Sequence, residues 1–169
     1  HELSHGTVFK TKWLNGFFVR VFSLLGWLNF WHYKMSHTYH HLYTLHPRGD
    51  REVVLPKHPS LKALYLFQLF TFNIFGGLES TGLVATLRSS IKLALFGKFN
   101  DDWSEAIFSA DQSEARKEAI NWARFVLLFH LGIIFISIAF RLWLLPVVVT
   151  FAPFIGNWWR YFVGVPMHT

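Results

Sequence analysis

Uncharged apolar runs dominate the second half of the chain. The stretches Phe125–Phe140 and Leu142–Trp159 contain no Asp, Glu, Lys or Arg, and they are bounded by Arg124, Arg141 and Arg160. Each approaches the ~20 residues that a helix needs to cross the hydrocarbon core of a bilayer. Prolines in the second stretch would kink that helix without preventing it. The pattern therefore predicts a transmembrane hairpin of two antiparallel spans with a tight turn at Arg141.

Three other apolar stretches are either interrupted by charge or short. Trp13–Tyr33 carries Arg20 near its middle, which is costly at the centre of a bilayer. An amphipathic helix in the membrane interface is therefore at least as well supported there as a span. Ala63–Leu78 has no charge but is short, which favours a partly inserted or re-entrant helix. Thr81–Phe96 fits an interfacial helix with one polar stripe. The region that follows, Asn100–Lys117, is polar, and we expect it to form short water-exposed helices and loop.

The composition supports a membrane location. Apolar residues make up 52% of the chain and aromatic residues 19%, whereas charged residues make up only 15%. Soluble domains carry roughly 25% charged residues, so this chain lacks the polar surface to cover its apolar content in water. The net charge of +6 comes from basic residues scattered at the ends of the apolar runs. That placement favours anchoring to membrane lipid and excludes the clustered basic stripe of a nucleic-acid-binding protein. We therefore expect an all-α integral membrane protein.

Histidines are concentrated near the beginning of the chain. Seven of the ten lie within the first 46 residues, and His37, His40 and His41 fall within five residues of one another. On a helix, His37 and His41 would lie one turn apart on one face, with His40 about 60° round from His37. This spacing places three imidazole nitrogens around one point, as a transition metal requires.

The surroundings of these histidines restrict the metal chemistry. The chain has no cysteine, and no Asp or Glu lies between Glu2 and Asp50. Thiolate sites are therefore excluded, and so is a ferritin-like di-iron site, which draws mainly on carboxylates. The expected ligand set is nearly all imidazole.

A second histidine pair, His1 and His5, leaves an alternative open. His1-Glu2-x-x-His5 is formally the pattern of zinc metalloproteases, in which the glutamate is the general base. That interpretation gives no role to the cluster beginning at His37. A non-enzymatic, His-rich membrane protein that handles metal is a further alternative.

Taken together, HELSH, then HTYHH, then an apolar hairpin resembles the membrane-bound fatty acid desaturase and hydroxylase superfamily. Its members carry three histidine boxes, HxxxH, HxxHH and HxxHH, at the cytoplasmic membrane face, where they hold two non-haem irons. The first two boxes are present, and the segment Gly164–His168 is similar to the family segment just before the third. The resemblance implies these metal ligands: His1, His5, His37, His40, His41 and His168.

The resemblance also implies an activity. We expect residues 1–169 to form a single desaturase domain that is incomplete, because the spans that usually precede the first box and the third box itself are missing. Such an enzyme introduces a double bond into the acyl chain of a lipid or thioester with O2. It takes electrons from a ferredoxin- or cytochrome b5-type donor. A hydroxylase or ketolase of the same superfamily is the alternative. Because imidazoles bind metal only when neutral, metal binding should weaken as the pH falls through their pKa.

The other histidines in and around these elements are left outside the ligand set. His32 and His46 flank the second box and are expected either to support ligands by hydrogen bonds or to lie at the interface. His130 lies alone in an apolar stretch, so we expect it to be hydrogen-bonded between helices. Glu2 either orients a ligating imidazole or faces solvent.

Overall fold

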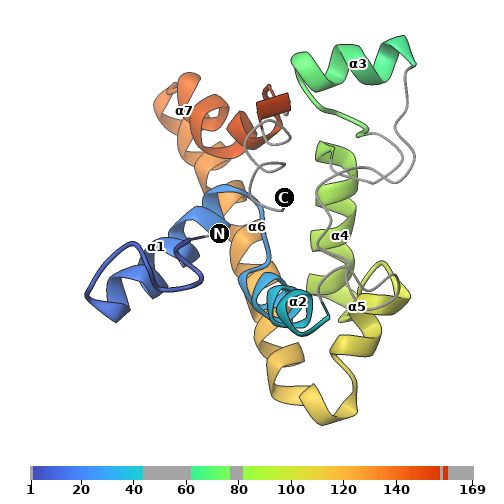
Figure 1. The fold of residues 1–169 in the computed structure, drawn as a ribbon. Coiled ribbons are helices and arrows are strands. Elements are labelled where there is room, and N and C mark those ends of the chain that lie inside the picture. Colours follow the sequence, from blue (N-terminus) through green and yellow to red (C-terminus); the bar gives the residue numbers. More distant parts are fainter. Residues whose placement is uncertain (1, 44–61, 77–81, 157, 160–169) are drawn as a thin grey trace.

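The regular secondary structure in the described part of the chain is helical apart from one isolated bridge, as predicted for an all-α protein. The structure is a computed structural model that describes residues 2–43, 62–76, 82–156, 158 and 159 (Figure 1). The α-helices, in chain order, are α1 (Lys12–Leu25), α2 (Phe30–Leu42), α3 (Ala63–Phe70), α4 (Leu83–Phe96), α5 (Asp102–Ile107), α6 (Ser113–Phe140) and α7 (Leu144–Pro146). The 3-10 helices are η1 (Ala110–Gln112) and η3 (Ala152–Phe154), and η2 (Val147–Phe151) is a π-helix.

Helix α6 is the central element, and α2, α4, α7, η1 and η2 all contact it. Figure 1 shows α6 running through the molecule, with α4 beside it and α2 packed across it. One core cluster joins α4, α5 and the first half of α6, and Phe108 and Ala119 are fully buried in it. A second cluster, formed by Trp27, Val126 and Phe154, joins the turn before α2 to α6 and η3.

Helix α6 is also the one helix in the described residues that is long and apolar enough to cross a membrane. Together with η1 it spans Ala110–Phe140, 31 residues. Large apolar side chains point outward along its second half, including Leu128 at 69% exposure and Phe135 at 73%. A continuous apolar surface of this kind is unfavourable in water and favourable in lipid.

The predicted second span, Leu142–Trp159, is not one helix. The chain does turn at Arg141, which ends α6 in the left-handed conformation at φ 56°. The following apolar helical segment is only Leu144–Phe154, too short to cross a bilayer of ordinary thickness. It passes from α-helix to π-helix to 3-10 helix, since Pro146 and Pro153 lack the N–H group that a continuous helix requires. Beyond it, Ile155 is extended and pairs with Phe72.

The predicted stretch Trp13–Tyr33 is divided between two helices. Helix α1 ends at Leu25 after 14 residues, and α2 begins at Phe30, so neither part is long enough to span. The side chain of Asn29 accepts a hydrogen bond from the His32 backbone N–H and caps α2. Within Ala63–Leu78, helix α3 covers only eight residues.

The predicted water-exposed region forms a compact corner around α5. Glu105 accepts a hydrogen bond from the Phe99 backbone N–H through one carboxylate oxygen and forms a 2.7 Å ion pair with Arg116 through the other. Arg116 also donates to the carbonyl groups of Gly97 and Phe108. This network fixes the connection between α4, α5 and the beginning of α6.

Candidate metal centre

Three histidines from the first two boxes converge at one point. The Nε2 atom of His37 lies 3.1 Å from that of His5 and 3.2 Å from that of His41. One ligand atom from each of the three rings lies within 4.8 Å of the other two. His37 is buried, whereas His5 and His41 are exposed, so the group opens toward solvent on one side.

These separations suit ligands of one metal ion. Metal–nitrogen bonds of about 2.0–2.1 Å place adjacent ligands roughly 2.9–3.4 Å apart in octahedral or tetrahedral geometry. An imidazole nitrogen carries either one hydrogen or one lone pair, so His37 cannot form two well-directed hydrogen bonds to its two neighbours. A metal ion at the common point would instead receive one lone pair from each ring.

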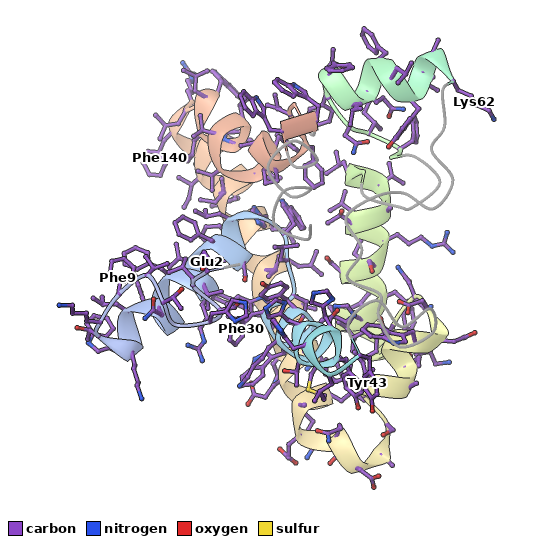
Figure 2. The ribbon with its side chains drawn as sticks, in the orientation of Figure 1. Glu2, Phe9, Phe30, Tyr43, Lys62 and Phe140 are labelled. Carbon is purple, nitrogen blue, oxygen red and sulfur yellow. The ribbon has the colours of Figure 1, made fainter. Side chains whose placement is uncertain are left out.

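Helix α2 presents two of the three rings, and the segment before α1 presents the third. His37 and His41 lie four residues apart, and their rings meet edge to face at 4.6 Å. His5 belongs to a run of turns over residues 2–6 that folds back along α1; Figure 2 shows Glu2 near the centre of the molecule and Phe9 toward its edge. The site is therefore formed between two segments separated by the whole of α1.

Two polar residues that the sequence patterns did not single out hold the His5 segment in place. Asn15, buried in α1, accepts a hydrogen bond from the Phe9 backbone N–H and donates to the carbonyl groups of Phe9 and Gly6. The Tyr33 hydroxyl is hydrogen-bonded to Ser4 at 3.2 Å, and its ring stacks on His37. A polar residue within an apolar helix was the only sequence signal for Asn15.

The electrostatic environment favours the neutral, metal-binding form of His5. Desolvation by the surrounding groups lowers the pKa of His5 below its ordinary value, even though its side chain is exposed on one side, and the neighbouring imidazoles of His37 and His41 lower it further. Glu2 acts in the opposite direction, but its carboxylate accepts a hydrogen bond from Thr7. His5 therefore keeps its lone pair to lower pH than an isolated imidazole.

The other predicted ligands have different outcomes. His40 is buried on α2 but does not belong to the group of three; its ring centre lies 6.0 Å from that of His37 and 5.5 Å from that of His41. On a helix His40 and His41 differ by about 100°, so the two rings leave α2 in different directions. His1 and His168 lie outside the described residues, as does His46, which was not among the predicted ligands.

The zinc-protease pattern finds no support in the described part of HELSH. Residues 2–6 form turns, whereas that pattern needs a helix to bring both histidines to one face. His5 instead faces His37 and His41.

The two remaining described histidines are hydrogen-bonded within the fold. His32 contacts the Ser104 hydroxyl at 2.8 Å, and that hydroxyl donates to Asp101, so His32 is the donor in its bond to Ser104. Burial lowers the pKa of His32. His130 contacts Thr150 and the Leu24 carbonyl, which confirms its predicted role between helices.

Comparison with known proteins assigns the chain to a family. No curated protein and no solved structure matches the chain significantly. The family described as fatty acid desaturase matches it over residues 1–169, which include His5, His37 and His41. That family is membrane-associated, in agreement with the apolar helix α6. The chain belongs to the fatty acid desaturase family.

Proposed function

We propose that this protein is a membrane fatty acyl desaturase, which introduces a double bond into an acyl chain with O2 and a pair of non-haem irons. The observation that carries the proposal is the convergence of His5, His37 and His41 from two histidine boxes. Imidazole is a ligand suited to iron, and the described cluster contains no thiolate or carboxylate that would direct it to another metal chemistry.

The two irons would be held by different subsets of the predicted ligands. His5, His37 and His41 are close enough to share one ion. His40 leaves α2 on another side, which suits it to the second ion, with His1 and His168 as further proposed ligands. Iron bound there would supply the activation of O2 and the removal of hydrogen from an unactivated CH2 group.

A cavity of about 850 Å³ is the proposed site of the acyl substrate. It lies between the turn before α2, helix α4, helix α6 and η3, and its size is in the range of ligand sites. Trp27, Val126 and Phe154 form an apolar part of its lining, and Ser89, Asn100, Asp101 and Ser104 contribute polar groups.

This lining suits an acyl chain that bears a polar carrier. His5, His37 and His41 do not line the cavity. His32, five residues before His37 on α2, reaches it.

The chain's own residues have separate roles in this proposal. The histidines bind and orient the metal, and Tyr33 and Asn15 hold the first box against the second. The exposed apolar side chains of α6 place the protein in lipid. The histidine boxes would then face the cytoplasm, where a ferredoxin- or cytochrome b5-type protein supplies the electrons.

A hydroxylase or ketolase of the same superfamily is the alternative, and product analysis distinguishes them. The full-length protein would be supplied with a labelled acyl lipid or acyl thioester, O2 and a reducing system, and the products analysed by mass spectrometry. We expect a product that is lighter than the substrate by two hydrogens. The variants His37→Ala and His41→Ala should give no product. An oxygenated product without a new double bond would overturn the desaturase proposal.

A further inference from the structure

The turn between α1 and α2 has an unusual residue at its most constrained position. The Leu28 N–H bonds to the Ser23 carbonyl and the Trp27 N–H to the Leu24 carbonyl, the pattern that closes many helices. In that pattern the residue in the left-handed conformation is normally glycine. Here it is Trp27, at φ 58°, although Gly26 is its immediate neighbour. A bulky residue remains in this conformation only where its surroundings impose it.

The Trp27 side chain supplies that constraint. Its indole ring stacks on the His130 ring at 4.0 Å and an interplanar angle of 6°, and its N–H donates to the Thr150 carbonyl at 2.8 Å. His130 and Thr150 are each 1% exposed. The α1–α2 turn is therefore joined to both α6 and η2 by one buried side chain.

The hydrogen bonds of His130 define its tautomer. The Leu24 carbonyl can only accept, so the Nε2 atom of His130, 3.0 Å away, carries the hydrogen. The Nδ1 atom then accepts from the Thr150 hydroxyl at 3.2 Å. Both ring nitrogens are thus used to tie α6 to the end of α1 and to η2.

Two further bonds fasten the other side of the turn to α6. The Trp122 indole N–H donates to the Leu28 carbonyl at 3.0 Å, and the Asn29 amide donates to the Ala119 carbonyl at 2.7 Å. The beginning of α2 is therefore fixed in position and direction before the second histidine box is reached.

This turn controls the geometry of the proposed metal centre, because His5 precedes α1 and His37 follows the turn. His37 lies seven residues after the start of α2, roughly 10 Å along its axis, so a tilt of about 6° at the turn would displace its ring by ~1 Å. Metal–ligand distances in proteins lie within about 0.2 Å of their usual values, so a displacement of ~1 Å would move the ring out of bonding range. We propose that Trp27, stacked on His130 and bonded to Thr150, is a positioning residue that sets the angle of α2 and thereby brings the second histidine box to the first. The inference rests on the proposed metal centre.

A distance measurement tests the positioning without metal. The chain has no cysteine, so nitroxide labels can be attached to cysteines introduced at Trp13 and Leu42, which are 67% and 68% exposed on α1 and α2. In the full chain we expect Trp27→Gly to shift or broaden the distance distribution between the labels. Thr150→Val, which removes only the hydroxyl bonded to His130, should have a smaller effect in the same direction and serves if Trp27→Gly does not fold. An unchanged distribution in the folded variant would overturn the proposal.

Cobalt binding provides the second readout. We expect Trp27→Gly to bind Co²⁺ about 10- to 100-fold more weakly, as is typical when the support of a ligand is removed, and Trp27→Phe to restore part of the affinity. The control is Gln68→Ala in α3, which removes the buried acceptor of the Ile74 and Phe75 backbone N–H groups; it should lower the melting temperature and leave Co²⁺ affinity unchanged. Equal losses in the control and in Trp27→Gly would overturn the proposal. If the unaltered protein binds no Co²⁺, the proposed metal centre fails, and the label distances still decide the positioning role.

Discussion

Removal of the His37 imidazole is the sharpest test of the metal centre. Of the three clustered rings, His37 is the one whose Nε2 lies 3.1–3.2 Å from both others, and it is 7% exposed. We expect His37→Ala to weaken Co²⁺ binding by about two orders of magnitude while leaving the helix content unchanged. His5→Ala and His41→Ala should each weaken it as well.

The magnitude follows from what one ligand contributes. Structural zinc sites with four protein ligands bind with about 10–16 kcal/mol, roughly 3 kcal/mol for each ligand. A loss of about 3 kcal/mol corresponds to a decrease in affinity of ~100-fold. Co²⁺ binds imidazole sites more weakly than Zn²⁺ does. This lowers the affinity of the unaltered protein and of His37→Ala alike, so the expected ratio between the two is unchanged.

The assay is an anaerobic Co²⁺ titration of the purified full chain in detergent, followed by absorbance. Thr38→Ala is the matched control, because Thr38 is exposed beside His37 and, among the described residues, its hydroxyl bonds to the Lys34 carbonyl of its own helix. It should bind Co²⁺ as the unaltered protein does. If His37→Ala retained the affinity of the unaltered protein, the three histidines would not form a metal site.

Further predictions concern pH and stability. Because the pKa of His5 is lowered in the folded protein, the unfolded chain takes up a proton near pH 6.5, at a higher pH than the folded chain does. The free energy of unfolding should therefore be highest above that pH and should decrease as the pH falls from 6.5 through the folded pKa. Thermal melting of the metal-free protein between pH 8 and pH 5 would show this, and His5→Gln should reduce the decline. Arg141→Gly should raise the free energy of unfolding by about 0.5–1 kcal/mol, because glycine adopts the left-handed conformation without strain; a lower melting temperature would contradict this. Glu105→Ala should lower the free energy of unfolding by about 1–3 kcal/mol in denaturant, because it removes both the Arg116 ion pair and the acceptor for the Phe99 N–H. The control Glu114→Ala loses an exposed ion pair with Lys117 and should have little effect.

Several features could be predicted from the sequence because they depend on local pattern. The four-residue spacing of His37 and His41 places them on one helical face wherever that helix lies. The uncharged run Phe125–Phe140 is part of α6 and predicts the apolar surface of that helix. Because a buried imidazole without a partner is unfavourable in apolar surroundings, the same run also predicts that His130 is hydrogen-bonded. The absence of nearby carboxylates restricted the ligand chemistry without any coordinates.

Tertiary contacts decided what local pattern could not. His40 and His41 are adjacent in sequence, and only the position of His5, 32 residues before His37, selects His41 for the cluster of three. At the end of α1, glycine would be the usual residue in the left-handed position, yet Trp27 takes it beside Gly26, because its indole is held by groups more than 100 residues away. The apolar helical segment after Arg141, predicted as a second span, is short because its prolines change the helix type and the chain beyond it pairs with Phe72. In each case the sequence offers near-equivalent local choices, and a long-range contact supplies the free energy that selects one of them.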